Sequence, residues 1–324
     1  MTTRSASPLA VWAGIIVLYV VWGSTYLAIR VAVGSIPPFL MGAMRFIPAG
    51  LLLGAGVVAY GRGAVRLPSL GETRDAAIVG ACLIGGGMGV VSWAETMVPS
   101  GTTALLVALM PMWLGILTRI VYAERMARRA VIGTVVGLVG VAVLAGPSIA
   151  GGGAEAPGLI ALLISPMCWA TGSLYAARKA VLPRPALMAT SAEMLLGGLL
   201  LLIVATLTGE LTGFSPSAVE PQAWAGLLYL ITIGSLVGFV TFAWLIGVAP
   251  LARVTTYAYV NPMVAVILGA IILSEPLELR TVLAAAIIVA GVVMIVSATG
   301  RRASSRDAER VAVEPTGDAS TAAA

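Results

Sequence analysis

Residues able to do chemistry are few in this sequence, and the missing types exclude most reactions. There is no histidine, so catalysis by Ser-His or Cys-His pairs and binding of metals by histidine are excluded. Cys82 and Cys168 each lie within an apolar run, where a small buried hydrophobe is the expected role. The acidic residues do not cluster in a pattern that could hold a metal ion and a pyrophosphate. The remaining candidates predict binding rather than catalysis, without metal or cofactor.

Three charged residues, Arg45, Glu95 and Glu193, interrupt long apolar runs. A charge at the centre of a bilayer costs about 2.5–3.5 kcal/mol on insertion scales, so it faces the protein interior or water. Glu95 could bind a substrate amine or a proton, or form a structural ion pair with Arg45. Arg45 could equally contact an anion. All three are retained as candidate substrate-binding residues, and the two carboxylates suggest coupling to protons.

The other candidate substrate-binding residues lie beside polar residues or at corresponding places in two halves of the chain. They are Trp22, Tyr26, Trp93, Trp169, Tyr175, Tyr257 and Asn261. Aromatic walls suit organic solutes and their ammonium groups through cation–π contacts. Packing in the core is the alternative for each aromatic residue.

The elements that must position these residues are membrane spans, because 59% of the chain is hydrophobic and only 10% is charged. A span needs about 20 apolar residues. A cleaved signal peptide at the N-terminus is the alternative to a first span, but no convincing cleavage site follows the first run. Ten spans are predicted: Leu9–Val33, Pro37–Tyr60, Ala76–Thr96, Thr102–Tyr122, Ala130–Ala145, Gly158–Arg178, Ala186–Thr208, Trp224–Ile246, Leu251–Leu273 and Val282–Ser297.

The chain repeats itself, which predicts a doubled all-α membrane protein. The segment from Pro99 to Glu124 is echoed from Pro250 to Glu275, an offset of 250 − 99 = 151 positions. Five spans per copy make the second copy enter the membrane from the opposite side, so two inverted five-helix repeats are expected. The expected divisions are residues 1–8, a first repeat at 9–146, a linker at 147–157, a second repeat at 158–298 and a disordered tail at 299–324.

Basic residues predict the orientation. With the N-terminus in the cytoplasm, 16 of the 19 Lys and Arg residues fall on the cytoplasmic side, all except Arg30, Arg45 and Arg280. This bias indicates that both termini are cytoplasmic. The net charge of +5 therefore reflects membrane topology, and the absence of a basic stripe with interleaved aromatics argues against nucleic acid as a partner.

Prolines and small residues predict where the spans bend and pack. Pro111 and Pro262 lie near the middle of the fourth and ninth spans, where each removes a helix hydrogen bond and could serve the conformational change or only shape packing. Gly133, Gly137 and Gly140, with Gly291, form a small-residue face for close packing of helices, within the chain or between two copies. Glu124 and Glu275 are expected to cap helices or pair with Arg125 and Arg280.

The order of several short motifs resembles the drug/metabolite transporter superfamily, specifically proteins with two EamA domains. The motifs are WGSTYLAIR at 22–30, PP at 37–38 with MRF at 44–46, AE at 94–95 with VPSG at 98–101, YAYVNP at 257–262, and the span-ending Glu124 and Glu275. The resemblance covers about residues 11–298. It implies a ten-helix carrier of small metabolites, in many relatives an exporter of amino acids or related compounds.

The predicted function is a multi-pass secondary transporter in the cytoplasmic membrane that moves a small organic solute by alternating access. Its expected partners are that solute and membrane lipid. No P-loop motif indicates ATP drive within the chain. The alternatives are a lipid-modifying membrane enzyme and a membrane scaffold or sensor. Substrate, direction, coupling ion and oligomeric state are left open.

Overall fold

The computed structural model describes residues 6–61 and 66–313, with the backbone alone at 251–252 and 299–313. Every element in the described part is helical, as a bilayer requires when backbone groups must be satisfied within each span. The elements are α1 (Pro8–Ala32), α2 (Pro38–Tyr60), α3 (Leu70–Gly80), η1 (Ala81–Gly89), α4 (Val90–Ala94), α5 (Ser100–Val107), α6 (Met110–Tyr122), α7 (Arg128–Ala150), α8 (Ala156–Arg178), α9 (Ala186–Leu207), η2 (Pro216–Ala218), α10 (Pro221–Tyr229), η3 (Leu230–Val237), α11 (Gly238–Val248), α12 (Leu251–Val254), α13 (Tyr257–Ile272) and α14 (Leu279–Val313).

The described residues contain nine stretches long and apolar enough to cross a membrane, and α12 with the shorter apolar helix α13 supplies the ninth span in chain order. The expected all-α membrane fold is therefore confirmed. Two spans are broken: the fourth at Ala108-Leu109, between α5 and α6, and the ninth at Thr255-Thr256, between α12 and α13. Two others contain π-helical turns, η1 in the third span and η3 in the eighth.

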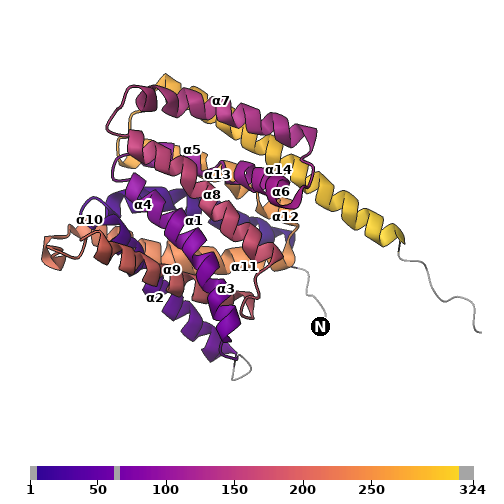
Figure 1. Ribbon diagram of the computed structural model, residues 1–324, viewed down its shortest axis with the longest axis horizontal. Coiled ribbons are helices and arrows are strands. Elements are labelled where there is room, and N and C mark those ends of the chain that lie inside the picture. The colour runs from indigo at the N-terminus through magenta and orange to yellow at the C-terminus, as the bar shows by residue number, and fades with distance from the viewer. Residues whose placement is uncertain (1–5, 62–65, 314–324) are drawn as a thin grey trace, which may run out of the picture.

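Spans from the two halves of the chain pack against each other. Helix α2 lies along α9, and α7 lies along α14, as the neighbouring ribbons of α7 and α14 show in Figure 1. Helix α1 packs on α10, α11 and α13, whereas α8 packs on η1, α4, α5 and α6. The first span thus belongs with the eighth and ninth, and the sixth belongs with the third and fourth.

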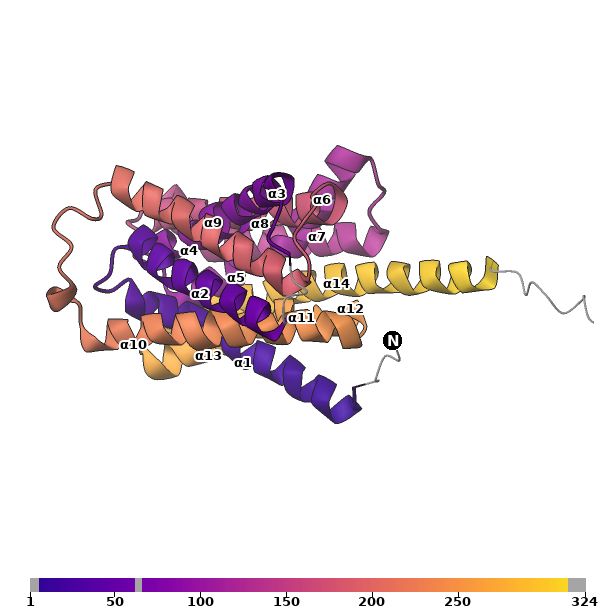
Figure 2. The same ribbon diagram turned by 90° about the horizontal axis from the view of Figure 1, so that it is seen from below.

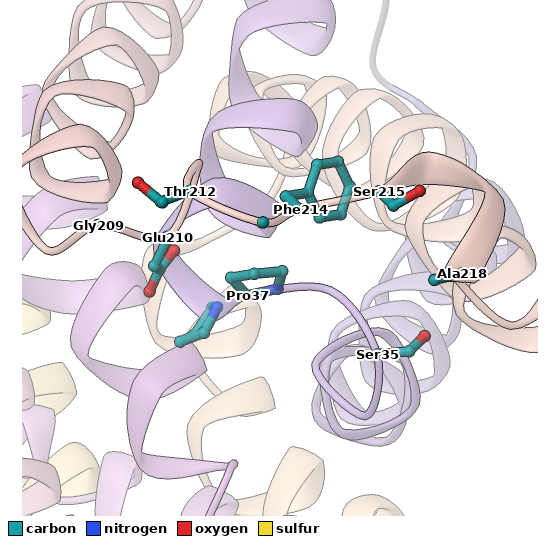
Figure 3. A pocket seen from close by; sticks show the side chains of 10 residues that line it. Ser35, Pro37, Gly209, Glu210, Thr212, Phe214, Ser215 and Ala218 are labelled. Atoms are coloured by element: carbon teal, nitrogen blue, oxygen red, sulfur yellow. The ribbon is translucent and has the colours of Figure 1, made fainter.

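Helix α1 begins, and α14 leaves the bundle, at the same end of the molecule (Figure 2). We call this the terminal end and the opposite end the distal end. The α1–α2 and α9–α10 connections lie at the distal end, where they form a cavity of about 370 Å³. Glu210 borders this cavity (Figure 3) and accepts a 2.8 Å hydrogen bond from the Leu40 amide. The contact joins the two halves at the first turn of α2.

The small-residue face packs within the chain. A Cβ built on Gly291 in α14 would lie 2.7 Å from the Gly133 carbonyl oxygen, and one built on Gly140 in α7 would lie 3.0 Å from the Ile288 nitrogen. Only glycine allows the two backbones to approach this closely. Of the two packing partners predicted for this face, the structure selects the second half of the same chain.

Two segments differ from the expected divisions. Helix α7 continues to Ala150, so only residues 151–155 separate it from α8, where a linker over 147–157 was expected. Helix α14 continues to Val313, into the segment 299–324 for which the sequence predicts a disordered tail. Residues 1–5, 62–65 and 314–324, which include Arg4 and Arg62, lie outside the described residues.

Candidate functional site

The deepest charge in the second span is almost completely buried. Arg45 in α2 is 3% exposed, and its Nε donates a 3.1 Å hydrogen bond to Ser235 Oγ. Its guanidinium lies 4.5 Å from the centre of the Phe46 ring, whereas Nη1 has no hydrogen-bond partner in the described part of the chain. Since a buried unpaired donor is costly, this group remains available to an acceptor from outside the chain.

Glu95 is the corresponding unpaired acceptor. It follows the last residue of α4 and is 0% exposed, yet neither carboxylate oxygen has a hydrogen-bond partner among the described residues. Its backbone carbonyl instead accepts a hydrogen bond from Arg30 Nη1. The sequence left open an ion pair between Glu95 and Arg45, and the structure places Arg45 on Ser235.

Tyr26 lies near both charged groups. It interacts electrostatically with Glu95, with Arg45 and with Tyr257. Glu95 also interacts with Arg45, although no ion pair within 4.0 Å joins them in the described part of the chain. The structure therefore gathers a carboxylate that follows α4, a guanidinium from α2 and a phenol from α1 around one buried region.

An aromatic cluster borders α1, α11 and α13. The Trp22 ring centre lies 4.9 Å from that of Tyr257, 5.2 Å from Phe242 and 5.6 Å from Phe239. The Tyr257 contact has an interplanar angle of 84°, an edge-to-face arrangement that aromatic quadrupoles favour. Trp22 can lie this close to η3 and α11 only because residue 238 is a glycine. A Cβ built on Gly238 would lie 2.5 Å from Trp22 Nε1, which is too close.

Trp169 occupies the related place in the other half. A Cβ built on Gly87 would lie 2.8 Å from Trp169 Cε3. Gly87 and Gly238 are 238 − 87 = 151 positions apart, the offset of the sequence repeat. Each glycine lies in or directly after a π-helical turn, η1 or η3, a form of backbone frequent at functional sites. The two tryptophans thus pack on related turns of opposite halves.

Asn261 and the prolines lie on the broken spans. Asn261 is 7% exposed, and its Oδ1 has no partner among the described residues. Pro111 is the second residue of α6, directly after the break in the fourth span. Pro262 lies inside α13, and the break in the ninth span precedes it at Thr255-Thr256.

The structure does not bring every candidate residue to this region. The Tyr175 hydroxyl donates a 3.0 Å hydrogen bond to Asp75 near the terminal end. The Glu193 side chain is half-buried in α9 without a hydrogen bond or ion pair to the described residues, and its backbone packs on Gly80. Trp93 in α4 makes no ring contact with the Trp22 cluster in the part that the structure describes.

Sequence reasoning missed Ser235, Gly238, Phe239 and Phe242. The repeat could have indicated Gly238, because Gly87 stands at the same place in the first copy. No comparable sequence signal indicates Ser235, whose hydroxyl reaches Arg45 from a residue 190 positions away.

A helical membrane bundle with two broken spans and buried, unpaired polar groups is an architecture typical of secondary transporters. The EamA-like transporter family matches residues 10–146 and 156–297. The chain therefore belongs to the EamA-like transporter family and is a multi-pass membrane transporter, not an enzyme.

Three relatives and one solved structure illustrate the similarity. The "Uncharacterized inner membrane transporter YedA" of Escherichia coli is 35% identical over 91% of this chain and 92% of its own length. A "Probable terminal-alkyne amino-acid exporter" of Streptantibioticus cattleyicolor is 28% identical over 90% and 95%. A "Probable amino-acid metabolite efflux pump" of Salmonella typhimurium is 24% identical over 85% and 91%. A crystal structure with a TM-score of 0.58 and 22% identity covers 90% of this chain and 98% of its own chain, and supports the fold.

Proposed function

We propose that this protein is a secondary carrier that exports small zwitterionic solutes, amino acids or close relatives, across the cytoplasmic membrane. The observation that carries the proposal is the pair of buried, oppositely charged groups, Arg45 and Glu95, which leave polar atoms unpaired. An α-amino acid offers a carboxylate for the Arg45 guanidinium and an ammonium group for Glu95. Each bond would be charge-assisted, about twice as strong as a neutral hydrogen bond.

The surroundings of these charges support an organic solute. Tyr26 interacts with both charges, and the cluster of Trp22, Phe242 and Tyr257 supplies apolar and π surface next to it. Asn261 adds an unpaired oxygen. Relatives named as amino-acid exporters favour the same solute class and direction.

Alternating access between two inverted halves is the proposed mechanism. The breaks in the fourth and ninth spans are places where helices can bend, and Pro111 lies directly after the first of them. The excess of basic residues on one side supports cytoplasmic termini, and a relative named an inner membrane transporter supports the cytoplasmic membrane. Coupling to protons through Glu95 or Glu193 is part of the proposal.

Counterflow in proteoliposomes tests the proposal because it needs no assumed driving ion. We expect saturable exchange of free amino acids and much weaker exchange of their N-acetyl and amide derivatives, which lack one charge. Glu95→Gln and Arg45→Met should each reduce the rate by about tenfold or more, the effect of losing one charge-assisted bond. Glu124→Gln, which alters a half-exposed ion pair with Arg178, is the matched control.

Two results would contradict the proposal. One is the absence of counterflow with any zwitterion in folded, monodisperse protein. The other is exchange that survives in both site variants. Proton coupling is tested separately: a transport rate that responds to a pH gradient equally in Glu95→Gln, Glu193→Gln and the parent protein would exclude a role for these carboxylates.

A further inference from the structure

The turn after α13 places the Glu275 side chain against the start of α5, in the fourth span. The amides of Leu273 and Glu275 both donate to the Gly269 carbonyl, at 3.0 and 3.1 Å, and Ser274 takes a left-handed conformation with φ 54°. This fold directs Glu275 to the first residues of α5, where Oε1 accepts from the Ser100 amide at 2.8 Å and from the Ser100 hydroxyl at 2.9 Å. Oε2 accepts from the Gly101 amide at 3.2 Å.

These bonds form a helix cap supplied by a residue 175 positions away. The first amides of a helix have no partner within it, and the positive end of its dipole favours an anion. Glu275 accepts three hydrogen bonds, which suits an ionised carboxylate. The sequence left two roles open for Glu275, a helix cap or a pair with Arg280; the structure shows the cap, and Arg280 pairs with Glu278 at 3.4 Å.

The cap ties together the two broken spans at the distal end. Helix α5 is the distal part of the fourth span, and α13 is the distal part of the ninth. Below the cap these helices are in close contact, since a Cβ built on Gly101 would lie 3.1 Å from the Val266 backbone. Ser100 is 0% exposed. Separation of the two spans at this end therefore requires the Glu275 bonds to break.

Glu95 follows α4 in the short connection that leads to Ser100, so it lies at the same end of the bundle as Glu275. An ionised Glu95 repels the Glu275 carboxylate, and this repulsion opposes closure of the distal end. A cation held by Glu95 would cancel this repulsion. Gly269 is needed for the arrangement, because a Cβ there would collide with Glu275 Oε2 and lie 2.9 Å from Ser100 Oγ.

We propose that Glu275 is a gate residue, the latch that holds the distal end closed, and that a cation at Glu95 strengthens the latch. The second part rests on the proposed function for the identity of the cation, the ammonium group of the solute. Binding of a cation at Glu95 and closure of the distal end are then coupled by the charges of two carboxylates.

The related position at the terminal end is built differently. Glu124 also follows a left-handed residue, Ala123 with φ 54°, but it pairs with Arg178 at 2.7 Å. At an offset of 151, Gly269 corresponds to Thr118 and Ser100 to Leu251. Thr118 has a side chain where the arrangement needs a glycine, and Leu251 lacks the hydroxyl that Ser100 donates. The latch is therefore a feature of the distal end.

Thiol labelling of the full chain in right-side-out membrane vesicles tests the gate without a known solute. Leu105→Cys is the reporter: Leu105 is 0% exposed and lies one turn below Gly101 on the same face of α5. Cys82 and Cys168 are replaced by Ala, and the probe is a membrane-impermeant maleimide.

We expect Glu275→Gln to raise reporter labelling about fivefold, because one carboxylate oxygen is replaced by an NH₂ group that faces the donors of Ser100 and Gly101. Glu95→Gln should lower it about twofold or more.

Glu278→Gln, in the same connection but outside the latch, is the matched control and should leave labelling unchanged. Leu162→Cys, 0% exposed in α8, should stay unlabelled, and the exposed Thr212→Cys should label in every background. Gly269→Ala provides a second way to displace Glu275 and should act like Glu275→Gln.

The latch is overturned if reporter labelling is equal in Glu275→Gln, Gly269→Ala and the parent, or if labelling of Leu162→Cys rises together with that of the reporter. Unchanged labelling in Glu95→Gln overturns the coupling, whether or not the protein transports amino acids.

Discussion

At the scale of single residues, two glycines explain how large aromatic rings enter the centre of this bundle. Gly238 and Gly87 each stand where a tryptophan ring would collide with a Cβ. Burial of an indole ring contributes a large apolar area to the packing. The space at Gly238 also lets Trp22 lie beside Tyr257 and Phe242. The small residue thus decides the position of the large one.

A Cβ at position 238 should therefore destabilise the protein. We expect Gly238→Ala to lower the free energy of unfolding by about 1–3 kcal/mol, since an added methyl group overpacks a filled interior. Thermal unfolding in detergent, followed by tryptophan fluorescence, measures the effect. Gly56→Ala in α2 is the control, because a Cβ there meets nothing within 4 Å. Equal melting temperatures for both variants would show that Trp22 moves aside without cost.

At the scale of elements, irregular helices hold most of the candidate site residues, and regular helices support them. The long helices α7 and α14 pack backbone against backbone through Gly133 and Gly291. The third, fourth, eighth and ninth spans instead contain π-helical turns or breaks, and these spans, with the first and second, present the charged and aromatic groups. An irregular backbone in a membrane is tolerated where protein or a cavity covers it.

Gly291→Ala tests the supporting role of the α7–α14 pair. A Cβ at this position lies 2.7 Å from the Gly133 carbonyl oxygen and from the Gly137 nitrogen, so the backbones must separate. We expect a loss of stability of about 1–3 kcal/mol or more, together with increased hydrogen exchange along α7. Gly146→Ala in α7, which meets nothing within 4 Å, should neither lower the stability nor increase the exchange, because alanine favours a helix more than glycine does. Exchange that stays at the parent level in Gly291→Ala would contradict the close packing.

At the scale of the whole molecule, the two ends of the bundle differ. The terminal end holds the start of α1 and the exit of α14 (Figure 2). Most basic residues are assigned to it by the sequence. The distal end holds the Glu275 cap and the cavity beside Glu210. The positive-inside rule then predicts that the terminal end is cytoplasmic.

Reporter fusions test this orientation. A fluorescent protein that folds only in the cytoplasm should be bright when fused after Ala324, and alkaline phosphatase at the same place should be inactive, because an even number of spans returns the chain to the starting side. Insertion of the phosphatase at Thr212, in the distal α9–α10 connection, should give an active enzyme. The reverse pattern of activities would invert the proposed topology.

The sequence by itself determined the membrane class, the spans, the doubling and the family resemblance, because hydropathy, charge bias and repeats are local or periodic properties. It also named the buried charges Arg45 and Glu95. Only the tertiary structure decided which groups meet: Arg45 bonds Ser235 across 190 positions, and Glu275 caps Ser100 across 175. These contacts depend on how each helix is rotated against its neighbours. Side-chain packing sets that rotation, and the apolar pattern of a membrane span leaves it open.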